Sequence, residues 1–379
     1  MKDGSLCCIV VEAVSARRGG SQTYLRNLFK HYTSKDSERV IVIVHEKSKE
    51  KFLNIHPNIE VLSPKFPSIS LFHRWFWQYF ILPRLLIRLQ AKVVYFPGGS
   101  SSIRTSTHYK LATACRNMLP FLRKERSRYP VGYMRVRLWA LRYAQSRLFQ
   151  TADLLIFVSQ YAKSIIDRKG DSIVIPHGVS DEFRVATSDL DRPDISNEFV
   201  LYVSIIDVYK AQIEVVRAWY ALRQMRATRE RLVLIGPEYA PYGRRLKREI
   251  RKLKLTEEVL ILGDLPHSEL PSYFHYAKVN LFASSCENCP NILLEALAAG
   301  KPVMCSSYEP MPEFASDSVQ YFDPYSSIEL ASKLSVLLDD PDAQLELGNR
   351  AARRAGSFVW QEAADRTWAS LRLLADQSA

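Results

Sequence analysis

Two glutamates flank a segment with the residue types of a ligand-binding loop. Glu287 and Glu295 lie eight positions apart in the stretch 279–303, VNLFASSCENCPNILLEALAAGKPV. The stretch predicts a strand, a small polar loop and a helix that begins at Pro290 or Asn291, because proline suits the first helical position. The N-terminus of a helix attracts anions through its free N–H groups and its dipole, so this segment predicts a binding site for a diphosphate.

The spacing of the two glutamates argues against one class of chemistry. They are expected on different elements, so they do not form the close acid/base pair of a glycosidase. Carboxylates accept hydrogen bonds from hydroxyl groups, so one could hold a transferred sugar and the other a ribose. A plain loop and helix with two solvated glutamates would show the same spacing, and only the surrounding sequence separates these interpretations.

Charge is distributed unevenly along the 379 residues. The first 190 residues carry 30 Lys and Arg against 14 Asp and Glu, whereas the remainder carries 22 against 26. A basic half is typical of a protein with an anionic partner: a membrane surface, a phosphorylated substrate or nucleic acid. A solvated basic surface that keeps the protein soluble is the alternative.

Six cysteines are present, and Cys286 and Cys289 form a C-x-x-C pair without a second Cys or His pair at zinc spacing. No metal site is therefore expected, and the cysteine usage fits a reducing cytosol. The N-terminal apolar run carries Glu12, which favours a core strand over a signal peptide. Charged residues and Pro83 interrupt the apolar stretch 71–89, which does not read as a membrane span.

Short Val/Ile/Leu runs alternate with helical patterns over the whole chain, which predicts α/β architecture with parallel sheets covered on both faces. The polar stretch 181–198 reads as a linker between two halves of similar size. We therefore expect two doubly wound, Rossmann-like domains facing each other across a cleft. The expected parts are an acceptor-binding domain at 1–180, the linker, a nucleotide-binding domain at 199–356 and a C-terminal helix at 357–379 that could pack back on the first domain.

The segment around the two glutamates resembles the donor-binding signature of GT-B fold glycosyltransferases of family 4, the retaining, metal-independent group. Further segments are similar to the same family over roughly residues 150–345. They are ADLLIFVSQYAK (152–163), VIPHGV (174–179, with His177 where the family has Asn), LYVSIIDVYK (201–210), LGDLPHSELPSY (262–273) and YFDP (321–324).

The resemblance implies a donor site in the second domain. Glu287 would contact the donor sugar, Glu295 the nucleotide ribose, and Lys210 would neutralise the diphosphate, as a compact point charge does well. Backbone N–H groups of Asn291 and Ile292 would bind sugar or phosphate. Asn288 and Pro290 complete this predicted donor-binding set.

Two positions depart from the family pattern. Many relatives have Gly-Arg before the lysine, and Ser204 and Ile205 stand there instead. A second positive charge would have to come from elsewhere, such as Arg116 or an arginine in the run 123–137. Many relatives also carry a histidine after a first-domain strand, and Asn117 takes that place here; asparagine is no general base but exchanges hydrogen bonds.

The mechanism implied by the resemblance tolerates the lack of a base. In a same-face retaining mechanism the leaving phosphate accepts the acceptor proton, so the protein mainly stabilises the diphosphate and holds both sugars. We therefore count Glu287, Lys210 and Asn117 as the candidate catalytic residues. Gly19 and Gly20 follow the first strand and resemble the family's glycine-rich loop over the donor phosphate or the acceptor.

A basic and aromatic face is expected on the first domain. Nine Lys and Arg lie between 116 and 147, interleaved with aromatic residues, and the stretch 71–89 adds further aromatic residues. This face could contact an acceptor or anionic lipid, or it could consist of ordinary amphipathic helices. Its candidate residues are Arg116, Arg123, Arg126, Arg128, Trp75 and Trp77.

We expect a hexosyltransferase that moves a sugar from a UDP- or GDP-sugar to a glycan acceptor, which would be lipid-linked, in surface polysaccharide or lipopolysaccharide synthesis. It would need no cofactor and would work in the cytoplasm, at the inner face of the cell membrane. The alternatives are a nucleotide-sugar epimerase of the same fold, a basic nucleic-acid- or membrane-binding protein without activity, and a catalytically inactive relative. Zinc, helix-turn-helix and RNP-like motifs are missing from the sequence, so no nucleic-acid partner is expected.

Overall fold

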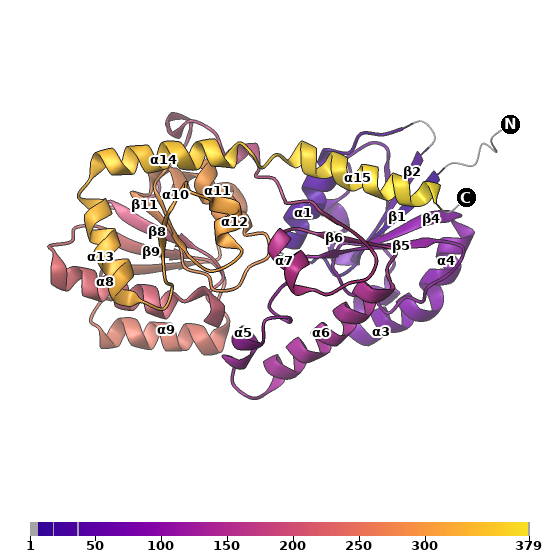
Figure 1. The fold of residues 1–379 in the computed structure, drawn as a ribbon, viewed down its shortest axis with the longest axis horizontal. Helices are drawn as coiled ribbons and strands as arrows, with labels where there is room; N and C mark the ends of the chain where they lie inside the picture. The colour runs from indigo at the N-terminus through magenta and orange to yellow at the C-terminus, as the bar shows by residue number, and fades with distance from the viewer. Residues whose placement is uncertain (1–6, 18, 36–37, 378–379) are drawn as a thin grey trace. The chain divides into compact units, whose positions relative to one another are not determined.

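The computed structural model describes residues 7–17, 19–35 and 38–377, and it divides into two compact units. Unit 1 comprises Met1–Arg126, Pro130–Gly178 and Trp360–Ala379, and unit 2 comprises Ser127–Tyr129 and Val179–Val359 (Figure 1). The C-terminal segment therefore belongs to the first unit. The polar stretch 181–198 belongs to unit 2, where Phe183 is fully buried.

Unit 1 is built on a seven-stranded parallel sheet with the order β3-β2-β1-β4-β5-β6-β7. Its central strands are nearly continuous runs of Val, Ile and Ala that are buried on both faces, as parallel sheets require. The strands are β1 (Cys7–Ala13), β2 (Glu38–Val44), β3 (Ile59–Leu62), β4 (Ala91–Phe96), β5 (Lys110–Cys115), β6 (Leu154–Phe157) and β7 (Asp171–Val174).

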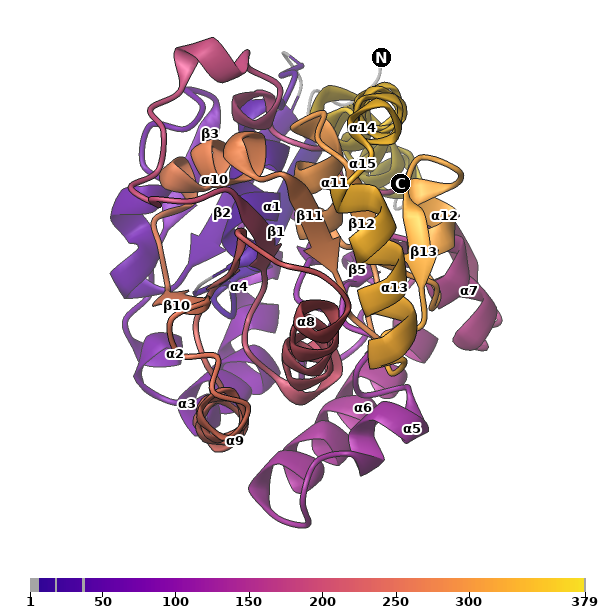
Figure 2. The ribbon, with the colours of Figure 1, turned by 90° about the vertical axis from the view of Figure 1, so that its left-hand side faces the viewer.

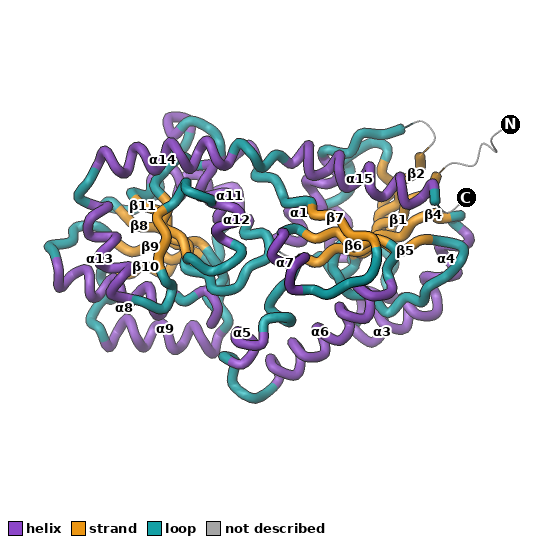
Figure 3. The backbone as a smooth tube through the Cα atoms, viewed as in Figure 1, coloured by secondary structure: helices purple, strands orange, loops and turns teal. Residues whose placement is uncertain are grey.

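Helices cover both faces of this sheet (Figure 3). One core packs α1 and α15 against it, with Trp368 donating a hydrogen bond from Nε1 to the Leu28 carbonyl at 3.0 Å. The opposite core contains Trp77 and Leu82. The helices are α1 (Gly20–Lys30), η1 (Glu46–Lys51), α2 (Phe66–Ile69), α3 (Leu71–Phe76), the π-helical turn η2 (Trp77–Ile81), α4 (Leu82–Arg88), α5 (Arg123–Ser127), α6 (Tyr133–Thr151), α7 (Gln160–Ile165) and α15 (Trp360–Asp376).

Unit 2 contains a six-stranded parallel sheet with the order β10-β9-β8-β11-β12-β13. Here β8 and β11 are neighbours although two strands lie between them in the sequence, so the strand order reverses at this pair. The strands are β8 (Phe199–Val203), β9 (Arg231–Ile235), β10 (Val259–Gly263), β11 (Val279–Phe282), β12 (Val303–Ser306) and β13 (Gln320–Phe322).

The helices of unit 2 also lie on both faces of its sheet (Figure 2). Short 3-10 turns and helices follow the strands, and α14 packs along α11. The elements are η3 (Asp181–Phe183), η4 (Thr187–Asp189), η5 (Val208–Lys210), α8 (Gln212–Met225), α9 (Ala240–Lys252), η6 (His267–Glu269), α10 (Leu270–Tyr276), α11 (Asn291–Ala298), α12 (Met311–Ala315), α13 (Ser327–Leu338) and α14 (Pro341–Ala355).

The helix that carries Glu295 is held by a close backbone approach. Gly300, with φ of +65°, ends α11 in the left-handed region, as glycine after a helix commonly does. A Cβ atom on Gly348 of α14 would lie 2.4 Å from the Gly300 carbonyl oxygen. The contact between α11 and α14 therefore depends on the missing side chain at Gly348.

We expect Gly348→Ala to lower the free energy of unfolding of unit 2 by about 1–3 kcal/mol, because backbone must move to accept the methyl group. The substitution raises helix propensity, so the sign of the effect identifies the clash. The matched control is Asn349→Ala at the next, exposed position of α14. Chemical denaturation measures both; a Gly348→Ala protein as stable as the control would contradict the close approach.

Candidate functional site

The predicted donor residues lie at the carboxyl ends of β8 and β11, where the strand order of unit 2 reverses. Open α/β sheets bind ligands at such points because the loops diverge there. The turn after β8 carries Lys210 and the loop after β11 carries Glu287. The structure therefore brings these two residues together from positions 77 residues apart.

Lys210 ends the short turn η5, and neighbouring strands fix this turn. The Tyr202 hydroxyl donates to the Lys210 carbonyl at 2.7 Å, and the Ser285 N–H donates to the Tyr209 carbonyl at 2.8 Å. Asp207 caps the turn through the Val208 N–H at 2.7 Å. The lysine is thus held at the carboxyl end of the central strand β8 and does not extend into solvent.

The Lys210 ammonium forms an ion pair with Oε1 of Glu287. Both side chains are largely buried, with 8% and 15% of their surfaces exposed. The ammonium also lies 5.1 Å from the Tyr209 ring centroid and 5.4 Å from that of Phe282, where aromatic faces attract a cation. The sequence suggested separate contacts for these two residues, and in the structure they also contact each other.

The helix α11 begins directly after the Glu287 loop, with Pro290 at the N-cap. The Asn291 N–H donates to the Cys289 carbonyl at 3.0 Å, so it is already used within the loop. The Ile292 N–H belongs to the first helical turn, whose N–H groups have no acceptor inside the helix. Asn288 is buried in the loop. Of the two predicted backbone donors, Ile292 is better placed for a phosphate.

Glu295 lies in the second turn of α11 and is buried. Its Oε1 is 3.1 Å from Nε2 of His267, and Nδ1 of that ring is 3.2 Å from Oε1 of Glu182. Burial raises the pKa of Glu295, and the contact with His267 opposes this effect. Hydrogen bonds to Glu182 and Glu295 raise the pKa of His267 to about 10.

His267 and Glu182 were not identified from the sequence as functional residues. His267 belongs to the segment LGDLPHSELPSY, whose resemblance to the family was noted without assigning the histidine a role. Glu182 lies in the stretch that was read as a linker. The three residues are more than 25 positions apart, so only the fold reveals the contact.

Arg128 lies beside the loop after β11. Residues Ser127–Tyr129 belong to unit 2, although the chain on either side of them belongs to unit 1. Its guanidinium donates to Ser285 Oγ at 3.2 Å and to the Tyr325 hydroxyl. It also lines a cavity of about 710 Å³ together with Val208 and Ile213, which flank the Lys210 turn. The nearby Ser204 has a structural contact instead, since its hydroxyl accepts from Gln212 Nε2 at 2.8 Å.

The predicted glycine loop and Asn117 belong to unit 1. Gly19 has φ of +61° and precedes α1, and a Cβ there would meet nothing within 4 Å, so conformation rather than space favours glycine. Arg116 donates to the Gly20 carbonyl at 2.8 Å and lies over the Tyr24 ring. Asn117 is exposed, and its Oδ1 accepts from the Leu119 N–H at 3.1 Å.

The residues predicted for a basic and aromatic face divide into separate groups. Trp75 is 47% exposed on α3 and stacks with Tyr79, and Arg123 is exposed on α5, where Arg126 is half-buried. The assignment of Trp77 to this face is wrong: it is 3% exposed and packs in the core. Trp75 and Trp77 are two positions apart, so a helix does not present both on one face, and composition alone misplaced Trp77.

Exposed apolar side chains concentrate on two segments of unit 1. The first is the face of α2, α3 and η2, which we call the aromatic face: Phe66, Ile69, Leu71, Phe72, Trp75, Phe76, Phe80 and Ile81. The second is α6, where Tyr133, Val136, Trp139 and Tyr143 are each more than 60% exposed among arginines. Within the described part of the chain, no helix is both long and apolar enough to span a bilayer.

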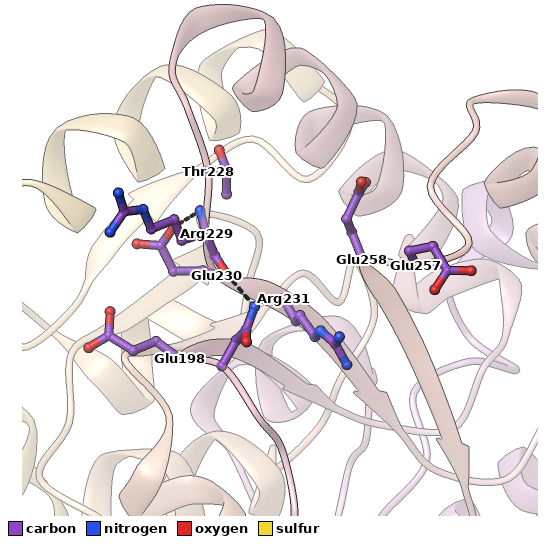
Figure 4. Close-up of a pocket in the computed structure, with 8 residues that line it drawn as sticks. Glu198, Thr228, Arg229, Glu230, Arg231, Glu257 and Glu258 are labelled. Carbon is purple, nitrogen blue, oxygen red and sulfur yellow. Dashed lines mark hydrogen bonds between the residues drawn. The ribbon is translucent and has the colours of Figure 1, made fainter.

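A further polar cavity of about 520 Å³ lies at the other edge of the unit 2 sheet (Figure 4). Glu198, Arg231 and Glu258 line it near the amino ends of β8, β9 and β10. Ligand sites of parallel sheets form at the carboxyl ends of the strands, so this cavity is not the expected donor site.

Two family patterns together cover most of the chain. The pattern described as "Glycosyltransferase Family 4" matches residues 18–183, and the one described as "Glycosyl transferases group 1" matches residues 192–354. The first range contains β2 to β7 of unit 1 but not β1, and the second contains all six strands of unit 2. The second range contains Lys210, Glu287 and Glu295.

Curated relatives are distant. A D-inositol 3-phosphate glycosyltransferase from Pseudarthrobacter chlorophenolicus is 25% identical over 47% of this chain and 43% of its own. An O-antigen chain mannosyltransferase B from Escherichia coli is 28% identical over 30% of each chain. The chain thus spans less than half the length of these relatives.

Solved structures share the fold over nearly the full length. Sucrose-phosphate synthase from Thermosynechococcus elongatus superimposes with a TM-score of 0.75 at 16% identity, covering 97% of this chain and 99% of the other. HepE from Anabaena in complex with UDP gives a TM-score of 0.71 at 17% identity, with 97% and 99% covered. The expected GT-B fold class is confirmed.

Proposed function

Because the chain belongs to the group 1 glycosyltransferases of family 4, which are retaining and use a nucleotide-sugar, we propose that it transfers a hexose from a UDP-sugar to a glycan acceptor. The observation that carries the proposal is the buried Lys210–Glu287 ion pair at the N-terminus of α11. UDP is favoured over GDP because HepE of the same fold binds UDP and UDP-glucose.

In the proposed mechanism the donor diphosphate becomes a second anionic partner for Lys210. The Lys210 ammonium then interacts with the leaving phosphate as well as with Glu287. The freed capacity of the Glu287 carboxylate accepts hydrogen bonds from the donor sugar. The first turn of α11 adds its dipole and the Ile292 N–H. Stabilisation of the leaving diphosphate lowers the barrier, and this phosphate takes the acceptor proton, so Asn117 need only position hydroxyl groups.

The proposed acceptor is a lipid-linked glycan of surface polysaccharide or lipopolysaccharide synthesis, reached at the inner face of the cell membrane. Two observations support it. One relative is a mannosyltransferase of the O-antigen chain. The aromatic face of unit 1 exposes several large apolar side chains, and Arg74 lies on the same helix, a composition that suits the headgroup region of an anionic bilayer.

A donor screen tests the proposed reaction. We expect UDP-sugars to raise the melting temperature more than GDP-, ADP- or dTDP-sugars by mass action. Lys210→Met and Glu287→Gln should each lower transfer to an acceptor glycan by about 10²–10³-fold, since each removes charge stabilisation or sugar contact. Lys333→Met is the matched control, because Lys333 pairs with Glu329 in unit 2 at half-exposed positions.

Several outcomes would contradict this assignment. Wild-type turnover in both the Lys210 and Glu287 variants would show that these two residues do not take part in the reaction. Epimerised donor in the absence of any acceptor would favour the epimerase. Nucleic-acid binding with steep salt dependence and no nucleotide-sugar binding would favour the non-enzymatic alternative.

We also propose that Arg128 provides the second positive charge on the diphosphate, in place of the arginine that Ile205 replaces. It lies beside Ser285, two positions before Glu287, and beside the residues that flank the Lys210 turn. Arginine binds phosphate through a planar fork of donors.

Arg128→Gln should therefore weaken binding of UDP by about tenfold or more while it changes binding of uridine little, because uridine has no phosphate. Isothermal titration with both ligands measures this ratio, and Arg123→Gln on the exposed side of α5 is the matched control. If Arg128 only holds its loop in place, Arg128→Gln will weaken the binding of UDP and of uridine alike. This outcome would contradict the proposed phosphate contact.

Membrane contact predicts that Phe72→Ser combined with Trp75→Ser lowers binding to vesicles rich in phosphatidylglycerol by about tenfold or more, since less apolar surface can be buried. Sedimentation with vesicles measures the effect. Leu373→Ser, at a position that is 63% exposed on α15, controls for the loss of apolar surface elsewhere. An equal loss of vesicle binding in the control variant would contradict a specific role of the aromatic face in membrane contact. So would a wild-type protein that does not bind the vesicles.

A further inference from the structure

The buried carboxylate of Glu295 has two oxygen atoms in different situations. Oε1 lies 3.1 Å from Nε2 of His267. Oε2 is also buried, and within the described residues it has no hydrogen-bond partner. A buried carboxylate oxygen without a partner costs folding free energy, so each such atom in a native protein needs an explanation, and a hydrogen bond from a ligand is one.

His267 connects Glu295 to a second carboxylate. Its Nδ1 lies 3.2 Å from Oε1 of Glu182, and the Phe183 ring packs edge-on at 5.2 Å. With an acceptor at each ring nitrogen, the imidazole can donate to both only when it is protonated. The charged groups that face Glu295 are thus His267 from η6 and Glu182 from η3.

We propose that His267 is a positioning residue that keeps Glu295 ionised and holds its Oε2 toward the ribose, so that the site selects nucleotides with a ribose hydroxyl that donates to Oε2. The inference rests on the proposed function, because it requires a nucleotide at this site. Without the cation, burial favours the protonated carboxyl group, which accepts hydrogen bonds less strongly than a carboxylate. Donor selection would then depend on a residue that never touches the donor.

The experiment compares UDP with UDP analogues that lack the 2′- or the 3′-hydroxyl. In the wild type we expect removal of at least one hydroxyl to weaken binding about tenfold or more, with little change from pH 6 to 8.5. In His267→Ala this preference should fall severalfold, and UDP affinity should rise with pH as Glu295 loses its proton. His267→Gln keeps one hydrogen-bond donor without the charge, so it separates the two contributions.

Matched variants control the interpretation. Glu182→Gln should reduce the preference less than His267→Ala, because the contact between His267 and Glu295 remains. Glu269→Gln makes the same change on the exposed side of η6 and should behave as the wild type. If the role of His267 is purely structural, His267→Ala will lower the melting temperature and weaken the binding of UDP and of its analogues equally. The affinity would then not depend on pH.

The outcomes separate this inference from the proposed function. UDP binding with an unchanged hydroxyl preference in His267→Ala would overturn the role of His267 and leave the donor site intact. Failure of the wild type to bind UDP would overturn the proposed UDP donor and the inference together.

Discussion

The buried ion pair between Lys210 and Glu287 is the constraint on which the donor site of unit 2 depends. Removing two charges from water costs several kcal/mol per ion, by order of magnitude, and an interior pair persists only when its partners are fixed. The Tyr202 hydroxyl and the Ser285 N–H fix the lysine turn through hydrogen bonds to its carbonyl groups. The carboxyl end of β8 therefore holds a fixed positive charge, which is the preorganisation that the proposed contact with a phosphate requires.

A second pair of a carboxylate and a cation involves Glu295 in the second turn of α11. Glu295 is buried and contacts His267, which is 41% exposed and in turn contacts the exposed Glu182. In both clusters a carboxylate is paired with a cation at the sheet edge and lies where the proposed ligand would bind. The site can thus exchange an internal partner for a group of the donor, so its own charged groups lose little further hydration on binding. Pairing with a cation also limits the free-energy cost of burying Glu287 and Glu295.

The sequence predicted the parts of the fold that local patterns determine. The run 279–282 is buried and forms the strand expected before the loop, and α11 begins at Asn291 between the two glutamates. Patterns failed where tertiary contacts decide. The composition of the stretch 71–89 does not show that Trp77 packs in the core, and the contact of His267 with Glu295 joins separate elements. Spacing along the chain carries no information about such pairs.

Departures from a family pattern need not mean lost activity, because a fold can supply the same charge from a different position. Ser204 and Ile205 leave the loop after β8 without an arginine, yet Arg128 lies beside the neighbouring loop through its hydrogen bond to Ser285. His177, where the family has asparagine, stacks on Trp360 in the core of unit 1. The first change removes a charge that, in the proposed function, Arg128 restores, and the second is accommodated by packing. The proposed function gives the buried Lys210–Glu287 pair a role, whereas stability alone does not, since a hydrophobic pair would stabilise this position at least as well.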